Sequence, residues 1–365
     1  MRVFVPRLMD AANRNAQNSN ARAILRWWNI QDSRVRTVAY DEPDLAVVAN
    51  PRVEITRLWR RHAWIAHLAL CYLRPCDAIF YPGVSAADSM GLSLRRRLGR
   101  AVPVIAVLEG LVGDAQREDE YSRLAGHAVH CQRVDPDVLD RVDALYDGAS
   151  HVIAISPFLA RLGASRYGDK FSVLPLGVDR AVFRSDGRAR PDRFTVVGAG
   201  RLYENKRPDV FLELAARFPS ADFTWYGEGE LRPALLAERS RRALTNVDYP
   251  GTLSATELAD KFRRASLFVL PSSAEGTPKV AQEAASCGLG VVLFGFYETP
   301  TVVDGRNGYV VWSDEELFAS VEALIREPAV AEALGNAGAQ MAQAWSWEDV
   351  ASKWIGQVLH VVGQS

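Results

Sequence analysis

The chain has 365 residues, of which 43 are basic and 44 are acidic, so its net charge is close to zero. This length suits two domains better than one, and a neutral balance gives no field that would attract nucleic acid. Hydrophobic residues make up 48% and charged residues 24% of the chain, which is typical of a soluble globular protein.

The amino terminus lacks the apolar core and small-residue cleavage site of a signal peptide. No apolar run approaches the roughly 18 residues that a membrane-spanning helix needs. We therefore expect a cytoplasmic protein.

Apolar, β-rich runs alternate with helical patterns along the whole chain, which indicates a parallel α/β architecture. Strands are predicted in the first half at residues 3–6, 37–40, 78–81, 104–108, 152–155 and 172–174. Helices are predicted there at residues 57–73, 91–98 and 136–145. The polar stretch 111–134 has weak periodicity, so we expect a long binding loop or lid.

The second half shows the same alternation. Strands are predicted at residues 195–198, 223–226, 267–270, 291–294 and 309–311. Ser254 with Glu257, and Ser313 with Glu316, have the spacing of capping boxes. Between the halves, an apolar-poor stretch rich in arginine and aspartate predicts a linker. We expect an N-terminal domain at 1–180, a linker at 181–192, a C-terminal domain at 193–345 and a final apolar helix at 346–365.

A polar turn follows the strand at 267–270, and Pro278 then starts a helix that ends near Gly288. Lys279 lies at the start of this helix, where the helix dipole disfavours a cation by about 0.3–1 kcal/mol. A bound phosphate would remove that cost; the alternative is a lysine extending into solvent. Glu275 and Glu283 could accept hydrogen bonds from sugar and ribose hydroxyls.

A second basic group follows the strand at 195–198. Arg201 and Lys206 are expected at the end of that strand, and Pro208 opens the next helix. Arginine and lysine are the side chains that bind phosphate. Gly227 and Gly229 form a turn in which a ligand could approach the backbone closely.

Together these motifs resemble the donor domain of retaining GT-B glycosyltransferases of the family-4 type, the glycosyl transferases group 1. The motifs are Gly200-Arg201…Lys206, Gly227-Glu228-Gly229 and Pro271-Ser272…Glu275-Gly276…Glu283-Ala284, with further likeness at 175–179 and 304–308. The resemblance covers residues 150–350 well and the first half only weakly. It implies two Rossmann-like domains facing a cleft, and we expect the C-terminal helix to return to the N-terminal domain.

The resemblance also implies an activity: transfer of a hexose-like unit from a nucleotide diphosphate sugar to an acceptor hydroxyl, with retention of configuration and without a metal. Arg201 and Lys206 would bind the diphosphate, Glu283 the ribose, and Glu275 the transferred sugar as a catalytic residue. Gly227, Gly276, Thr277 and Lys279 would complete the donor site. No cofactor is expected besides the donor, with UDP- and GDP-sugars as the leading options. The acceptor could be a saccharide, a lipid-linked saccharide or a small molecule.

The chain departs from the family pattern in two places. Thr277-Pro278 stands where many relatives have Phe-Gly, and because proline lacks an N–H, one backbone contact to phosphate is lost. The identity of the donor sugar therefore stays open. In the first half, Glu109 follows a strand where relatives have a histidine. It could deprotonate the acceptor hydroxyl as a catalytic base, or simply cap local N–H groups.

Other residues of the first half are weaker candidates. His127 and His130 are rivals of Glu109 in the long polar loop. The Asn/Gln cluster at 13–20, which includes Asn15, Gln17 and Asn18, could bind sugar or phosphate oxygens, or could cap a helix.

A basic and aromatic pattern allows peripheral contact with the inner face of a membrane; we favour an arginine face in solvent. It comprises Arg57, Trp59, Arg60, Arg61 and Trp64, with a second cluster at 95–97. Two other functions stay open: a GT-B sugar-nucleotide epimerase and a non-catalytic nucleotide-sugar-binding protein. A dinucleotide oxidoreductase is disfavoured because Gly198-Ala199-Gly200 lacks the third glycine of that fingerprint.

Overall fold

The computed structural model describes residues 1–12, 15–58, 63–187 and 191–363. The chain forms two compact units. Unit 1 holds Met1–Ala125, Cys131–Gly177 and Trp347–Ser365, and unit 2 holds Gly126–His130 and Val178–Ser346. Unit 1 thus gives way to unit 2 after Gly177, beside the predicted boundary at residue 180. The described residues of the predicted linker, 181–187 and 191–192, are part of unit 2, and residues 188–190 lie outside the described part of the chain.

Unit 1 is built on a parallel sheet. Its strands are β1 (Arg2–Leu8), β2 (Arg34–Ala39), β3 (Val53–Arg57), β4 (Ala78–Phe80), β5 (Val104–Leu108), β8 (His151–Ala154) and β9 (Phe171–Val173). In the described residues they lie in the spatial order β3-β2-β1-β4-β5-β8-β9. A separate small pair is formed by β6 (Val112–Gly113) and β7 (Gln132–Arg133). The central strands are continuous apolar runs because the sheet is buried on both faces.

The helices of unit 1 begin at residues that suit a helix start. They are α1 (Ala16–Arg26), α2 (Leu45–Val48), α3 (Trp64–Tyr72), α4 (Ala86–Arg97), α5 (Ala115–Ala125), α6 (Pro136–Asp147), α7 (Pro157–Tyr167) and α14 (Trp347–Gly363). Ser85 and Asp88 form a closed capping box at α4. Prolines occupy the first position of α6 and α7, where the missing N–H costs nothing.

Unit 2 repeats the architecture. Its strands are β10 (Thr195–Ala199), β11 (Asp222–Tyr226), β12 (Val247–Gly251), β13 (Leu267–Leu270), β14 (Gly290–Phe294) and β15 (Gly308–Val311). Within the described part of the chain they lie in the order β12-β11-β10-β13-β14-β15, all parallel. Both sheets therefore have the doubly wound strand order, which confirms the predicted pair of Rossmann-like domains.

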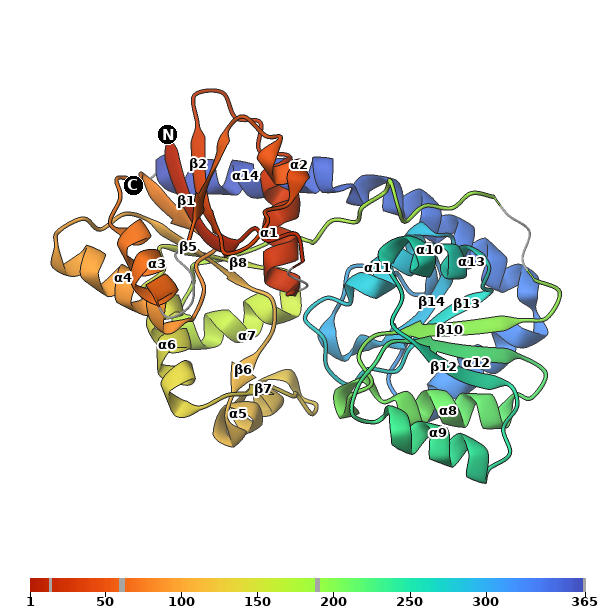
Figure 1. Cartoon of the computed structure of the whole chain (residues 1–365). Helices are drawn as coiled ribbons and strands as arrows, with labels where there is room; N and C mark the ends of the chain where they lie inside the picture. Colours follow the sequence, from red (N-terminus) through yellow and green to blue (C-terminus); the bar gives the residue numbers. More distant parts are fainter. Residues whose placement is uncertain (13–14, 59–62, 188–190, 364–365) are drawn as a thin grey trace. The chain divides into compact units, whose positions relative to one another are not determined.

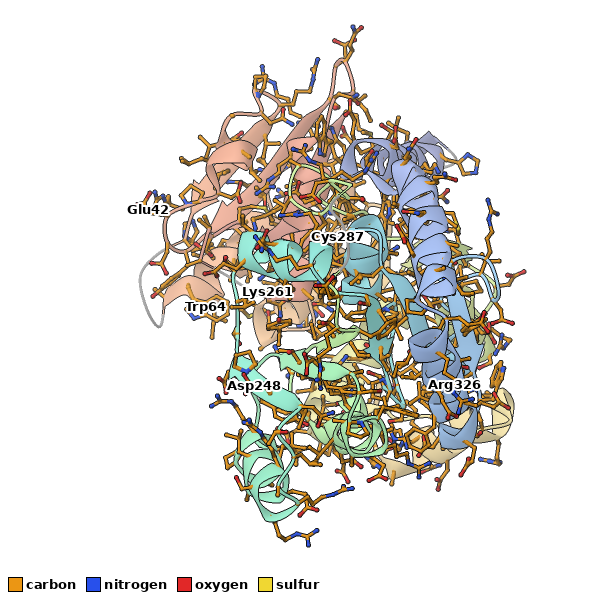
Figure 2. The ribbon with its side chains drawn as sticks, turned by 90° about the vertical axis from the view of Figure 1, so that its right-hand side faces the viewer. Glu42, Trp64, Asp248, Lys261, Cys287 and Arg326 are labelled. Carbon is orange, nitrogen blue, oxygen red and sulfur yellow. The ribbon has the colours of Figure 1, made fainter. Side chains whose placement is uncertain are left out.

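Helices cover both faces of the second sheet. They are α8 (Pro208–Arg217), α9 (Arg232–Arg241), α10 (Ala255–Arg263), α11 (Lys279–Ser286), α12 (Asp314–Arg326) and α13 (Pro328–Met341), with 3-10 turns η2 (Glu204–Lys206), η3 (Gly295–Tyr297) and η4 (Ala342–Trp345). Figure 1 shows α8 and α9 on one face, with α11 and α13 on the other. Figure 2 labels Lys261 on α10 and Cys287 at the end of α11.

The two predicted capping boxes differ in the structure. At α10, Ser254 and Glu257 exchange both bonds and close the box. At α12, the Ser313 hydroxyl accepts from the Glu316 N–H at 3.1 Å, but the Glu316 carboxylate accepts from the Trp312 N–H at 2.8 Å instead. The second box is therefore open.

Several sequence-based boundaries in unit 1 were wrong. Arg57 ends strand β3, and α3 begins only at Trp64, so these two residues do not share a helix. Trp59, Arg60 and Arg61, the rest of that basic and aromatic pattern, lie outside the described residues. The polar stretch 111–134 is no featureless loop, because α5 occupies its centre. Arg95 is buried and donates to the Tyr72 carbonyl at 2.6 Å, so it does not belong to a solvated cluster.

The predicted return of the C-terminal helix is confirmed. Helix α14 belongs to unit 1 and packs against α1. Trp354 of α14 is buried and donates from Nε1 to the Pro175 carbonyl at 2.9 Å, and its ring stacks on that of Tyr81. Among the described helices, none is long and apolar enough to cross a membrane.

Candidate functional site

The strand order of unit 2 reverses at β10, which pairs with β11 on one side and with β13 on the other. In open parallel sheets a ligand binds beyond the carboxyl ends of the strands at such a point. Here these ends carry the loop from Gly200 to Arg207 and the loop from Pro271 to Pro278. The Ser273 N–H donates to the Asn205 carbonyl at 2.9 Å, so the two loops are joined.

An ion pair connects two of the predicted site residues across these loops. Lys206 donates from Nζ to Oε1 of Glu275. The two side chains are only 21% and 10% exposed, respectively, so water screens the pair less than it would on an open surface. The cation predicted for the diphosphate and the carboxylate predicted for the sugar are therefore in direct contact.

The chain beside Lys206 is held in a defined turn. Arg207 adopts a left-handed φ of 50° between η2 and α8. Its guanidinium binds both carboxylate oxygens of Asp314, at 2.8 and 2.6 Å. A bidentate pair of this kind fixes geometry as well as charge, and it holds the end of the loop that carries Lys206.

Arg201 lies at the same strand end but is exposed to solvent. Its guanidinium lies 5.8 Å from the centre of the Tyr203 ring. Gly227 has a φ of 150°, and a Cβ at that position would collide with the Gly200 carbonyl. Packing of the two loops therefore requires this glycine, whereas its proposed role in admitting a ligand stays a prediction.

Helix α11 brings together the other predicted donor residues. Lys279 is its first residue and Glu283 lies one turn further on, while Thr277 is buried just before the helix. Burial raises the pKa of Glu283 to about 7; the charge of Lys279 opposes this rise, and that of Asp179 adds to it. Within the described residues, no side chain or backbone N–H donates a hydrogen bond to the Glu283 carboxylate. The Glu283 carboxyl is therefore half-buried with free acceptor capacity.

The carboxyl edge of this sheet also carries two hydroxyls that sequence reasoning missed. Ser272 and Tyr297 are 0% and 1% exposed, and neither hydroxyl has a hydrogen-bond partner among the described residues. Ser272 appeared in the sequence only as part of the Pro-Ser motif, and nothing in the pattern around Tyr297 set it apart.

In unit 1 the strand order also reverses, at β1, which pairs with β2 on one side and with β4 on the other. Glu109 follows β5, and its Oε1 accepts from the Tyr81 hydroxyl and, at 2.8 Å, from Asn20 Nδ2. Tyr81 is buried with a left-handed φ of 59°. Arg7 donates to the Tyr81 carbonyl at 3.0 Å and covers its ring at 4.6 Å, which stabilises this strained backbone.

The other candidate residues of the first half make contacts with residues other than Glu109. Asn15 caps α1, accepting from the Asn18 N–H at 3.3 Å. Gln17 accepts from Arg7 at 2.8 Å, which links it to the Tyr81 backbone. His127 belongs to the short segment that is part of unit 2, with its ring 5.3 Å from that of Phe296; His130 lies in the same segment. Of the two partners of Glu109, Asn20 belongs to the predicted Asn/Gln cluster at 13–20, whereas Tyr81 was not singled out from the sequence.

Comparison with known proteins identifies related sequences and folds. Residues 193–327 match the family described as Glycosyl transferases group 1. D-inositol 3-phosphate glycosyltransferase of Paenarthrobacter aurescens (strain TC1) is 31% identical over 239 residues, which are 57% of this chain and 57% of that protein. The chain thus spans a little over half the length of this relative.

Two solved structures share the fold. Sucrose-phosphate synthase from Thermosynechococcus elongatus superposes with a TM-score of 0.79 at 17% identity, over 100% of this chain and 99% of that one. Anabaena Alr3699/HepE, in complex with UDP and glucose, gives 0.75 at 15% identity over 99% of each chain. At these identities the likeness concerns the fold.

Proposed function

We propose that this chain, which has the GT-B fold and whose residues 193–327 match the family Glycosyl transferases group 1, transfers a hexose-like unit from a nucleoside diphosphate sugar to an acceptor hydroxyl. The observation that carries the proposal is the Lys206–Glu275 ion pair at the strand reversal of unit 2. The cation of this pair suits the diphosphate of the donor, and the carboxylate suits the sugar that is bonded to it.

Unit 2 binds the donor in this account. Lys206 and Arg201 contact the diphosphate, and the N-terminus of α11 with Lys279 adds positive potential. Glu283 accepts hydrogen bonds from the ribose hydroxyls, which its free acceptor capacity supports. We propose UDP-sugars as the first choice of donor, with GDP-sugars next, because a solved structure of similar fold holds UDP and glucose.

The transfer breaks the bond between the anomeric carbon and the diphosphate oxygen, and it forms a bond between that carbon and the acceptor oxygen. Arg201 and Lys206 stabilise the charge that develops on the leaving diphosphate, so we propose that the reaction needs no metal. Glu275 holds the sugar for attack on the face that the diphosphate leaves, which retains configuration. Glu109 takes the proton of the acceptor hydroxyl.

The acceptor is proposed as a class: a saccharide, a lipid-linked saccharide or a small molecule with a free hydroxyl. The relative named for inositol 3-phosphate supports a small hydroxylated acceptor. Because this chain spans 57% of that protein, we assign the class and not the compound.

A nucleotide-release assay tests the proposal. The protein is mixed with UDP- and GDP-sugars, with and without a panel of hydroxylated acceptors, in the presence of EDTA. We expect release of the nucleoside diphosphate to depend on the acceptor, and NMR of the product to show the donor's anomeric configuration. A new sugar epimer formed without an acceptor would instead indicate an epimerase, and binding without turnover would indicate a non-catalytic binding protein.

A further inference from the structure

Two buried hydroxyls of unit 2 are unusual because nothing in the described part of the chain satisfies them: Ser272 Oγ and Tyr297 Oη. Buried polar side chains nearly always have a partner, and each exception calls for an explanation such as a catalytic role. Both hydroxyls lie at one edge of one sheet. Ser272 comes two residues after the end of β13 and Tyr297 closes η3 after β14, and these strands pair in register up to Leu270 and Leu293.

That edge also carries the Lys206–Glu275 ion pair. Tyr297 lies within electrostatic reach of the Glu275 carboxylate. Burial raises the pKa of Tyr297 well above its ordinary value, Glu275 raises it further and the nearby Phe294 N–H lowers it. The hydroxyl therefore stays protonated, and its proton remains available for donation. The fold sets the position of this ring: Gly295 packs closely on Trp312, and Glu298 turns the chain with a left-handed φ of 46°.

The proposed function creates a need for a second partner of Glu275. In the structure Lys206 is the cation bound to this carboxylate, yet a donor diphosphate carries more negative charge and competes for the same ammonium. A largely buried carboxylate that loses its counter-charge is costly unless another donor replaces it. The buried Tyr297 hydroxyl is an unused donor at this edge of the sheet, and Glu275 influences it electrostatically.

We propose that Tyr297 is a positioning residue of the donor site: when the diphosphate draws Lys206 away, the Tyr297 hydroxyl donates to the Glu275 carboxylate and holds it toward the sugar. This inference rests on the proposed function of unit 2. The inference goes beyond the proposed function in two ways. It assigns a role to Tyr297, which lies outside the motifs, and it states that Glu275 exchanges Lys206 for Tyr297 when the donor binds.

The test is Tyr297→Phe in the full chain. Because the hydroxyl proton has no acceptor to lose in the free protein, the melting temperature of the variant should stay close to that of the wild type. Titration with UDP or GDP should give the wild-type Kd, since Tyr297 acts through Glu275 on the sugar and a free nucleotide carries no sugar. Titration with the matching nucleotide sugar should give binding about tenfold weaker than wild type, and kcat should fall.

Tyr249→Phe is the matched control. Tyr249 is a buried tyrosine of β12 in the same unit, and the sheet order places three strands between β12 and β14. Its hydroxyl has a partner, the Pro208 carbonyl at 3.5 Å. We expect this variant to bind both the nucleotide and the nucleotide sugar as the wild type does.

A double-mutant cycle with Glu275→Gln separates action through Glu275 from direct contact with the sugar. If Tyr297 acts through the carboxylate, Tyr297→Phe should have little further effect in the Glu275→Gln background. An undiminished effect in that background, or equal nucleotide-sugar binding by Tyr297→Phe and wild type, would overturn the inference. Failure of the wild type to bind any nucleotide sugar would instead overturn the proposed function itself.

Discussion

Lys206 and Glu275 are 69 residues apart in the chain, yet their charged groups bind each other where β10 and β13 end. The fold brings them together because β10 and β13 are neighbours at the reversal of strand order. The two residues belong to separate sequence motifs, and neither motif alone indicates the contact. The pair results from the topology of the sheet, and the proposed chemistry depends on it.

Loss of the lysine should destabilise the protein even without substrate. Lys206→Met leaves the Glu275 carboxylate without its cation in a site that is only 10% exposed, so we expect the free energy of unfolding to fall by roughly 2 kcal/mol. Denaturant unfolding measures this. The exposed Lys261 of α10 (Figure 2) provides the control Lys261→Met, which should change stability by less than about 0.5 kcal/mol. A wild-type stability for Lys206→Met would argue that the pair contributes nothing.

Substitution of Glu275 should separate chemistry from nucleotide binding. Glu275→Gln keeps the shape of the side chain but removes the charge that faces the sugar. We expect kcat to fall by roughly 100-fold or more, while the Kd of the free nucleoside diphosphate changes little. Steady-state kinetics and calorimetry report the two quantities. Unchanged turnover would remove Glu275 from the mechanism.

Glu283 should give stability a characteristic dependence on pH. Its pKa in the folded protein is raised to about 7 from an ordinary 4.5, so between these values the folded state holds a proton that the unfolded chain has released. Stability therefore falls as the pH rises through this window. Glu283→Gln lacks this decline, and its stability relative to wild type should increase by on the order of 1–3 kcal/mol from about pH 5 to about pH 8.

Urea unfolding across that range measures the effect. Glu332→Gln, at an exposed position of α13, is the control and should follow the wild-type curve. Parallel wild-type and Glu283→Gln curves would contradict the burial of this carboxyl.

Substitution of Glu109 should lower the rate of turnover and leave the affinity for the donor unchanged. Glu109→Gln removes the proposed base, which is in unit 1, so we expect kcat to fall by about 100-fold or more with an unchanged Kd for the nucleotide sugar. Asp119→Asn, at an exposed position of α5, is the control. Equal losses in kcat and in donor affinity would indicate a structural role for Glu109 and its bond to Tyr81.

Much of the fold followed from local pattern. The strand β13 and the helix α11 are bounded by an apolar run, a proline start and Gly288, whose φ of 86° ends the helix. Four of the described strands escaped prediction. β12 contains Pro250, which argues against a strand, and β3 is half exposed, so its flanking arginines suggested a helix. β6 and β7 are only two residues long each.

The site was harder to predict than the fold, because its contacts join distant segments. Sequence motifs pointed to Lys206 and Glu275 separately, but their ion pair depends on strand order. Tyr297 follows β14 in a segment without a motif, and its importance lies in a missing hydrogen bond. Likewise, Tyr81 looked like the end of a strand, and only its left-handed backbone directs the hydroxyl to Glu109.

The central claim is that unit 2 binds a nucleoside diphosphate sugar through Lys206. Calorimetric titration of UDP- and GDP-sugars into the wild type, Lys206→Ala and Lys261→Ala tests it most directly. We predict saturable binding to the wild type with a Kd between about 1 μM and about 1 mM, at least tenfold weaker binding to Lys206→Ala, and wild-type affinity for Lys261→Ala. Absence of binding to the wild type, or equal affinity of all three proteins, would contradict the account.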